Sequence, residues 1–590
     1  MTTTAPWWDR QLPSGMPSHR YRAVHDRVAL PSGPRSWPDA RLTAAPLWVP
    51  VDLRDGNQAL PEPMDPERKR RMFELLVAMG YKEVEVGYPS ASQTDFDFVR
   101  LLAGSELAPP DVTVSVFTAA RRDLVERTVE SVRGLRGDVL IHLYVATAPL
   151  WRRLVLRRSR QEVLELVLAG ARDVLELAGD LPRARFQFSP EVFNLTEPEF
   201  ALEVCDRVTA LWEASTDRPV VLNLPVTVEA ATPNVYADQI EWMHRSLARR
   251  EAVILSVHPH NDRGTGVACA ELALLAGAQR VEGCVFGNGE RTGNVDLATL
   301  ALNLHAQGVD PRVDFSDIDA VRRTVEECTG IAVHERHPYV GSLVHSAFSG
   351  THQDAIAKGF AALREEARAA GVDPRELAWE VPYLPVDPAD LGRSYDAVVR
   401  VNSQSGKGGA AYLLRGATGI ELPRAMQVDY ARHVQRLADD EGGEVDGERL
   451  ARLLHEVYAP EGGGVVLHGW HDEHPLDGAA SVTVDLAVEG ERRTRAFPGA
   501  GPVEALVLAL AERGVALEVR SLAQQSLGAG SAARAVSFLE YAAAGTAGWA
   551  LGLDSSTTGA NLAAVVSAAR RLVLGRAASP ATCASGSRLR

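Results

Sequence analysis

Between residues 47 and 308, short apolar runs rich in β-branched residues alternate with longer stretches that repeat apolar positions every three to four residues. The short runs are typical of buried strands, and the longer stretches are typical of amphipathic helices. The strand-like runs are LWVPVDL, KEVEVGY, VTVSVFT, DVLIHLY, ARFQFSP, PVVLNLP, AVILSVH and RVEGCVF. Helical stretches such as PERKRRMFELLVAMG and SRQEVLELVLAGARDVLELAG lie between them.

The number of these units decides between two folds. The same alternation could build an open, doubly wound sheet. Eight strand–helix units over about 260 residues instead match the size of a closed (β/α)₈ barrel. We therefore predict an α/β protein with a catalytic (β/α)₈ TIM barrel at residues 46–310.

After residue 310 the alternation ends. The helical patterns DIDAVRRTVEECTG and HQDAIAKGFAALREEARAAG are followed by the proline-rich stretch WEVPYLPVDPAD and the loop SQSGKGG. This order predicts helical accessory subdomains at residues 311–460. The loop resembles a phosphate-binding loop, but it lacks the GxxxxGK[ST] pattern, so a turn is the simpler interpretation.

A third pattern occupies residues 464–573. Strand-like runs, a glycine-rich turn and a helical stretch occur twice in the same order, which predicts a small C-terminal α+β domain with internal pseudo-symmetry. Residues 1–45 show no clear period and are expected to form an N-terminal arm. Residues 574–590 are small and polar, which is typical of a disordered tail.

Composition narrows the functional class. The net charge is −15, which argues against nucleic acid or an anionic membrane as partner, because both attract basic surfaces. No run of 18 uncharged apolar residues is present, and the first 24 residues lack the apolar core of a signal peptide. Five scattered cysteines indicate a reducing compartment, so we expect a cytoplasmic protein.

In a (β/α)₈ barrel, the chemistry is built where strands run into the loops that follow them. The polar residues at the eight predicted exits are therefore the candidates for a site. They are Arg54, Asp55, Gln58, Glu85, His142, Ser189, Glu191, Thr227, His258, His260, Asn288, Glu290 and Asn294.

Three of these candidates form a plausible ligand set. His258 and His260 are two residues apart on a predicted strand, so their side chains point to the same side. Together with Asp55 they offer two imidazoles and one carboxylate, which suit a divalent cation with open positions for substrate. Mg²⁺ or Mn²⁺ is expected, although this set also suits Zn²⁺. In the alternative interpretation these histidines, and His142, form local hydrogen bonds and bind no ligand.

Longer motifs point to a family. These are VDLRDGNQALPEPMDPERKRRMFELLVAMGYKEVEVGYPSASQTDFDFVR, HPHNDRGTGVACAELALLAGAQRVEGCVFGNGERTGNV and VPYLPVDPADLGRSYDAVVRVNSQSGKGGAAYLL. They closely resemble the 2-isopropylmalate synthase family, and the resemblance covers about residues 17 to 573. It implies an acyltransferase of leucine biosynthesis that condenses acetyl-CoA with 3-methyl-2-oxobutanoate and hydrolyses the thioester to give (2S)-2-isopropylmalate. It also implies a homodimer, and a regulatory C-terminal domain that binds leucine.

The resemblance assigns roles to single residues. Asp55, His258 and His260 match metal ligands, Asn294 matches a position near the metal, and Arg54 matches the arginine beside the keto oxygen. His142, Ser189 and Thr227 are expected to line the keto-acid pocket, and Glu191 matches a catalytic carboxylate. His352 and Tyr383 match residues that reach into the partner subunit's site. Either His352 or Glu191 could remove the methyl proton of acetyl-CoA.

The sequence departs from the family pattern around Thr557 to Asn561 and before the turn LGAGS, where relatives bind leucine. These departures concern the effector region and leave the catalytic candidates of the barrel unchanged. Two other interpretations stay open. One is a sister acyltransferase for another 2-oxo acid, such as a homocitrate or citramalate synthase. The other is a catalytically silent amino-acid sensor, against which the intact Arg54, Asp55, His258 and His260 argue.

Overall fold

The computed structural model describes residue 6 and residues 8–20, 37–347, 349–393, 407–441, 445–473, 480–528, 530 and 533–578. The first four residues of the loop SQSGKGG, at positions 403–406, lie outside these ranges. The chain divides into two compact units. The first comprises Met1–His345 and Leu363–Ser394, and the second comprises Ser346–Ala362 and Tyr395–Arg590.

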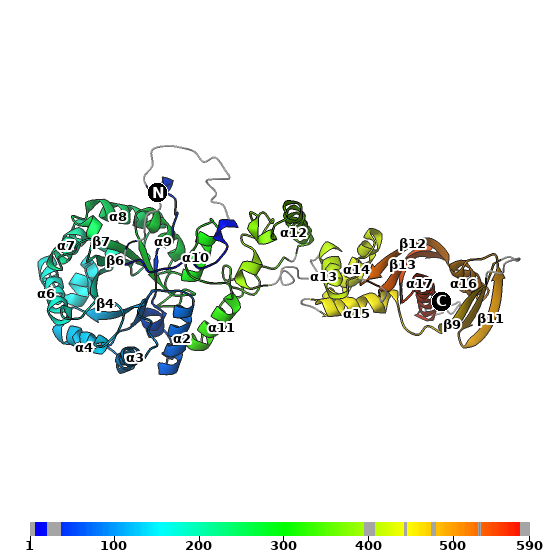
Figure 1. The fold of residues 1–590 in the computed structure, drawn as a ribbon, viewed down its shortest axis with the longest axis horizontal. Coiled ribbons are helices and arrows are strands. Elements are labelled where there is room, and N and C mark those ends of the chain that lie inside the picture. Colours follow the sequence, from blue (N-terminus) through cyan, green and yellow to red (C-terminus); the bar gives the residue numbers. More distant parts are fainter. Residues whose placement is uncertain are drawn as a thin grey trace, which may run out of the picture. The chain divides into compact units, whose positions relative to one another are not determined.

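The first unit is built around eight parallel strands (Figure 1). The strand order is β1-β8-β7-β6-β5-β4-β3-β2, and β1 lies beside β2, so the sheet closes on itself. The prediction of a (β/α)₈ barrel is confirmed. The strands are β1 (Leu47–Pro50), β2 (Glu83–Gly87), β3 (Thr113–Ala119), β4 (Val139–Ala146), β5 (Ala184–Glu191), β6 (Val220–Val226), β7 (Val253–Pro259) and β8 (Arg280–Gly283).

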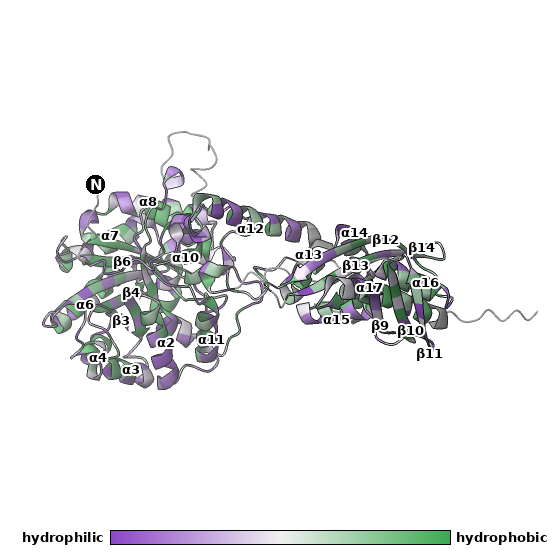
Figure 2. Ribbon diagram, turned by 45° about the vertical axis from the view of Figure 1, so that its right-hand side comes forward, coloured by the Kyte–Doolittle hydropathy of each residue, from purple (hydrophilic) through white to green (hydrophobic). Residues whose placement is uncertain are grey.

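Helices surround the strands (Figure 1). Their local signals are clear at α2, where Asp65 accepts a hydrogen bond from the Arg68 backbone N–H and Pro66 occupies the first turn. Figure 2 shows largely hydrophobic strands inside a ring of helices that carry hydrophilic residues. The ring consists of α2 (Pro66–Ala78), α3 (Gln93–Gly104), α4 (Arg122–Val132), α6 (Arg160–Ala178), α7 (Pro198–Leu211), α8 (Pro233–Ser246), α9 (Gly266–Leu275) and α10 (Leu297–His305).

The interior of the barrel is charged, whereas barrels of this kind are commonly filled by Val, Ile and Leu. Arg280 donates to Glu83 at 2.6 Å and to Glu282 at 2.7 Å. Arg185 donates to Glu83 at 2.9 Å, and Gln187 donates to Glu282 at 2.6 Å. All of these side chains are buried. Buried charges must be paired, and here each acid faces at least one arginine.

The predicted N-terminal arm packs against the barrel where residues 8–20 are described. The Trp8 side chain packs against the apolar cluster at the start of β4, β6 and β7. Gln11 accepts a hydrogen bond from the Trp48 backbone N–H at 3.0 Å, and Arg10 pairs with Asp138 at 3.0 Å. The arm therefore closes the end of the barrel that is opposite the strand exits.

The region predicted as one set of accessory subdomains, 311–460, is divided between the two units. Helix α11 (Ile318–Thr329) packs beside α2 in the first unit. The segment after it is held by Arg393, which donates to the Gly341 carbonyl at 2.9 Å and to Asp319 at 3.1 Å. Helix α12 (Gly350–Ala370) begins in the second unit and ends in the first.

In the second unit, α12 is followed by α13 (Lys407–Thr418), α14 (Arg424–Glu441) and α15 (Gly447–Tyr458), and two small sheets come after these helices. Each sheet is antiparallel and precedes one helix, which agrees with the predicted pseudo-symmetry. The first set is β9 (Val465–Glu473), β10 (Ser481–Val488), β11 (Glu491–Pro498) and α16 (Pro502–Ala511). The second is β12 (Glu518–Leu527), β13 (Arg534–Ala543), β14 (Thr546–Asp554) and α17 (Thr557–Ala578).

Helix α17 extends into the segment that was expected to be a tail. Residues 574–578 are helical, so the expectation of a tail from residue 574 was wrong at these five positions. Ala577 and Ala578 favour helix, and Pro580 disfavours helical conformation at the residue before it. Within the described part of the chain, no helix combines the length and the apolar character that a membrane crossing needs.

Candidate active site

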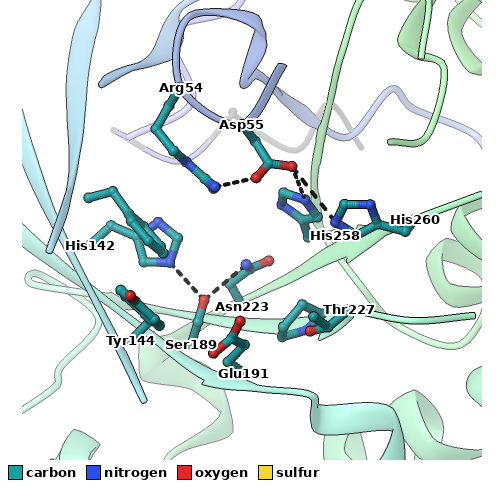
Figure 3. Close-up of a pocket in the computed structure, with 12 residues that line it drawn as sticks. Arg54, Asp55, His142, Tyr144, Ser189, Glu191, Asn223, Thr227, His258 and His260 are labelled. Carbon is teal, nitrogen blue, oxygen red and sulfur yellow. Dashed lines mark hydrogen bonds and ion pairs between the residues drawn. The ribbon is translucent and has the colours of Figure 1, made fainter. Parts of the chain in front are cut away.

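A cavity opens at the strand exits of the barrel (Figure 3). It is lined by Arg54, Asp55, Phe117, His142, Tyr144, Ser189, Glu191, Asn223, Pro225, Thr227, His258 and His260. Of the eleven residues to which the family resemblance assigns roles, eight are therefore brought together. Asn294 lies behind the cavity wall, against His258. His352 belongs to the second unit, and Tyr383 is 59% exposed in the first unit and does not line the cavity.

Arg54 and Asp55 are presented by a five-residue π-helical turn, Asp52–Gly56, directly after β1. Turns of this π-helical type are rare in proteins, and many of those that occur lie at functional sites. The guanidinium of Arg54 donates to Asp55 and to Glu85, both at 2.5 Å, and lies 4.2 Å from the centre of the Phe117 ring. The buried Lys69 ammonium fixes the turn by donating to the Leu53 carbonyl at 2.9 Å.

The carboxylate of Asp55 faces both histidines of β7 and its exit (Figure 3). Its Oδ2 atom is 3.5 Å from His258 Nε2 and 3.7 Å from His260 Nε2. One ligand atom from each of the three residues lies within 4.8 Å of the others, so this group could hold a metal ion.

The residues present fit a divalent metal. Asp55 Oδ2 and His260 Nδ1 are buried and have no hydrogen-bond partner within the described residues. A buried carboxylate oxygen without such a partner is costly unless a cation compensates it. Asn294 adds an amide oxygen 2.8 Å from His258 Nε2. Carboxylate and imidazole donors are common ligands of divalent ions in enzymes.

The pKa values of Asp55, His258 and His260 are shifted to different extents and in different directions. Burial opposes ionisation of Asp55, but the neighbouring Arg54 and His258 outweigh it and hold its pKa well below the usual range. Burial, and then the charge of His258, lower the pKa of His260 to about 4. Burial also lowers the pKa of His258, but the neighbouring carboxylates of Asp55 and Glu282 overcome this and raise it to about 10. His260 is therefore neutral at pH 7, the form in which imidazole binds metals.

The opposite wall combines a polar relay with aromatic rings. His142 Nδ1 is 2.6 Å from Glu85, and His142 Nε2 is 2.7 Å from Ser189 Oγ, which also accepts from Asn223 at 3.0 Å. The Phe117 and Tyr144 rings stack at 4.3 Å. His142 is 1% exposed, so it is both a hydrogen-bonded core histidine and part of the cavity wall.

Glu191 and Thr227 stand at neighbouring exits, after β5 and β6. Thr227 Oγ1 accepts a hydrogen bond from the Val192 backbone N–H at 2.9 Å, which ties the two exits together. Burial raises the pKa of Glu191, while Arg54 lowers it and Asp55 raises it to a smaller extent. Glu191 is therefore a carboxyl group that accepts a proton more readily than an exposed glutamate does.

Sequence reasoning missed four lining residues, Phe117, Tyr144, Asn223 and Pro225, and the supporting residue Glu282. All five missed residues lie inside the apolar runs that predicted strands, not at the predicted exits. The rule that residues i and i+2 share a face could have found Tyr144 from His142, and Asn223 and Glu282 are polar interruptions of strand patterns.

Family models match three successive parts of the chain. Residues 45–325 match the family model described as HMGL-like, and residues 342–415 match "Alpha-isopropylmalate synthase, post-catalytic domain-like". Residues 444–573 match the "LeuA allosteric (dimerisation) domain". A hydroxymethylglutaryl-CoA lyase structure from Pseudomonas aeruginosa is 22% identical with a TM-score of 0.40, and the match covers 49% of this chain and 95% of that chain.

Full-length relatives are more similar. The 2-isopropylmalate synthase of Nocardia farcinica is 72% identical over 459 residues, which are 78% of this chain and 79% of that protein. The 2-isopropylmalate synthase of Thermobifida fusca is 53% identical over 566 residues, which are 95% of this chain and 99% of that protein. The chain belongs to the 2-isopropylmalate synthase family.

Proposed function

We propose that this protein is a 2-isopropylmalate synthase, which condenses acetyl-CoA with 3-methyl-2-oxobutanoate and hydrolyses the thioester to give (2S)-2-isopropylmalate and CoA. The observation that carries the proposal is the convergence of Arg54, Asp55, His258 and His260 on one cavity, in a chain whose full-length relatives bear that name. As an enzyme of leucine biosynthesis it is proposed to act in the cytoplasm.

Asp55, His258 and His260 would hold one divalent ion, with Asn294 beside it, and Mg²⁺ is the proposed occupant, with Mn²⁺ and Zn²⁺ also compatible with the donors. When bound, such an ion supplies a Lewis acid for a 2-oxo acid substrate. Arg54 supplies a fixed positive charge on the same wall, which favours the negative charge that develops on the keto oxygen during attack. Its ion pairs with Asp55 and Glu85 fix the guanidinium before substrate arrives.

The keto acid would lie between the ligand group and the opposite wall. His142, Ser189 and Thr227 offer hydrogen-bonding groups for its carboxylate. The stacked Phe117 and Tyr144 rings offer an apolar surface for a small branched side chain. A pocket with both features suits 3-methyl-2-oxobutanoate.

A base must remove a proton from the acetyl methyl group. We propose Glu191 for this role, because it lines the cavity and burial raises its pKa. His352 is the competing candidate, and Tyr383 is proposed to accompany it from the partner subunit of a homodimer. The exchange of acetyl-CoA methyl protons for deuterium in D₂O distinguishes the two candidates. Glu191→Gln should stop this exchange. His352→Gln should slow it only if His352 acts on the proton.

The match to a LeuA allosteric (dimerisation) domain supports two further proposals, a homodimer and feedback inhibition by leucine bound in residues 464–573. These residues contain none of the residues that line the barrel cavity. A domain without chemistry, joined to a biosynthetic enzyme, suits an effector role.

The deciding experiment is a thiol-release assay with acetyl-CoA, Mg²⁺ and a panel of 2-oxo acids. We expect the highest kcat/KM with 3-methyl-2-oxobutanoate and loss of activity after chelation. If pyruvate or 2-oxoglutarate is preferred by more than tenfold, about 1.4 kcal/mol in the transition state, the protein is a sister acyltransferase. Absence of CoA release with every acid would instead favour a sensor.

A further inference from the structure

The segment that joins β4 to α6 is unusual in charge. Residues 149–160 read PLWRRLVLRRSR, with five arginines and no acidic residue, in a chain with a net charge of −15. They form a short helix, α5 (Pro149–Trp151), and a π-helical turn, η4 (Arg152–Leu156), before α6 begins. We call residues 149–160 the arginine turn.

Two of the five arginines hold the turn in place. Arg152 pairs with Glu197 at 2.7 Å and donates to the Thr147 carbonyl at 2.6 Å. Arg160 pairs with Glu203 at 3.0 Å. The Arg158 backbone N–H donates to the Arg152 carbonyl at 2.9 Å, which closes the turn on itself. The backbone of the turn is therefore anchored to α7.

The other three arginines, Arg153, Arg157 and Arg158, are exposed and form no ion pair with any residue that the structure describes. Arg157 has a left-handed backbone, with φ of 53°, which is uncommon for a residue with a side chain. Three guanidinium groups within six positions, without carboxylate partners, form a concentrated positive surface that is suited to a multiply charged anion.

Apolar side chains share this turn. Leu150, Leu154 and Val155 are 47%, 56% and 67% exposed. Single exposed apolar residues are common on protein surfaces. Here three of them lie beside the three exposed arginines, and exposed apolar groups of this kind often mark binding sites. A ligand that fits this surface carries several negative charges next to a group with a face that can lie on apolar side chains.

The turn lies at the rim of the cavity. It follows β4, which contributes His142 and Tyr144 to the cavity wall. Trp151 packs against Ala146, Ala148 and Val192, and Val192 is the neighbour of the lining residue Glu191. A substrate that extends out of the cavity on the side of Glu191 would therefore pass over the arginine turn.

We propose that the arginine turn binds the nucleotide end of acetyl-CoA. The 3′-phosphate and diphosphate pair with the guanidinium groups of Arg153, Arg157 and Arg158, and the adenine ring lies on Leu150, Leu154 and Val155. This inference rests on the proposed function, because it takes acetyl-CoA as the substrate. Planar guanidinium groups match phosphate geometry and hold it by paired hydrogen bonds.

The test compares two thioesters in two triple variants. In R153Q/R157Q/R158Q, KM for acetyl-CoA should rise about tenfold or more with kcat little changed, because the lost contacts are charge-assisted hydrogen bonds far from the reacting carbon. KM for S-acetylpantetheine, which lacks the nucleotide, should stay unchanged. The control R172Q/R207Q/R323Q removes three exposed arginines from α6, α7 and α11 and should leave both constants unchanged.

A direct binding measurement completes the test. Adenosine 3′,5′-bisphosphate should bind the wild-type protein in calorimetry, and binding should be lost in R153Q/R157Q/R158Q but not in the control. An unchanged KM for acetyl-CoA overturns the inference. An equal rise in KM for both thioesters, together with a changed molecular mass of the triple variant in light scattering, also overturns it. The turn would then be an interface between copies of the chain. If the wild type binds the bisphosphate but turns over no 2-oxo acid, the proposed function fails and the nucleotide site remains.

Discussion

At the scale of single residues, His258 is held between two oxygen atoms. Its Nδ1 atom lies 2.8 Å from Glu282 Oε2, and its Nε2 atom lies 2.8 Å from Asn294 Oδ1. Glu282 is itself fixed by Arg280 and Gln187. Histidines that bind metals commonly donate their second N–H to a carboxylate, which sets the tautomer and the ring orientation. We therefore propose that Glu282 is a positioning residue of this kind for His258.

Replacing Glu282 by Gln should weaken Mn²⁺ binding by about 10- to 100-fold, because the amide keeps the shape but removes the charge that orients His258. Electron paramagnetic resonance of Mn²⁺ measures this without turnover, and Asp55→Asn gives the reference for a lost ligand. Glu83→Gln is the matched control: it breaks ion pairs with Arg280 and Arg185 and should lower stability while Mn²⁺ affinity stays close to wild type. Wild-type Mn²⁺ affinity in Glu282→Gln would refute the role.

At the scale of elements, the hydrophobic pattern predicted all eight strands, because short runs rich in β-branched residues seldom form other secondary structure. The rule that strand exits carry the chemistry then pointed to Arg54, Asp55, His258 and His260, which the structure places on one cavity. The charged interior was not predicted, because a polar residue within an apolar run has no partner visible in sequence. Glu83 meets Arg280 across 197 positions, a pairing that only barrel closure creates.

Another element-scale feature links the segment after α11 to the start of α10. His337 Nε2 lies 2.6 Å from Asp296, with side chains 15% and 14% exposed. Burial lowers the pKa of His337, but the hydrogen bond and charge of Asp296 outweigh it and raise the pKa above its usual value. A histidine with a raised pKa in the folded state adds stability below its unfolded pKa, and this stability is lost as pH rises through the folded value.

His337→Gln should therefore lose more free energy of unfolding at pH 5.5 than at pH 9. Urea denaturation of the full chain at both pH values measures the difference. His334→Gln removes an exposed histidine three positions earlier that forms no ion pair with the described residues, and it should show no such pH dependence. An equal loss for His337→Gln at both pH values would show that the ion pair does not contribute.

At the scale of the whole molecule, the barrel cavity contains neither His352 nor Tyr383. If a partner subunit supplies them, two inactive chains should complement each other. When His352→Ala and His260→Ala chains mix at random, half of the dimers are heterodimers. Each heterodimer has one complete site out of two, so about a quarter of wild-type activity is expected. Measuring turnover after subunit exchange by mild denaturation and refolding provides the test. No recovery, although mixed dimers form, would contradict shared sites.

The proposed regulation by leucine would also be a property of the whole molecule. In the C-terminal domain, Asn561 accepts hydrogen bonds from Gln524 and Ser537, both at 2.6 Å. These contacts occupy a polar group in the region where the sequence departs from its family. We expect millimolar leucine to inhibit, with a coupling at the weak end of the ~1–3 kcal/mol that is usual between sites. Rate measurements and calorimetry with leucine test this. If leucine neither inhibits the enzyme nor produces a heat of binding, the domain has a structural role.

The charged interior of the barrel has a consequence for how this sequence can evolve. An apolar core tolerates stepwise exchange of Val, Ile and Leu, because each replacement costs only a change of volume. Replacing Arg280 alone instead leaves Glu83 and Glu282 without their shared counter-ion, while replacing several members of the network together could be neutral. Substitutions at Glu83, Arg185, Arg280 and Glu282 should therefore be strongly epistatic, and descendants of this protein should change these positions jointly or leave them unchanged.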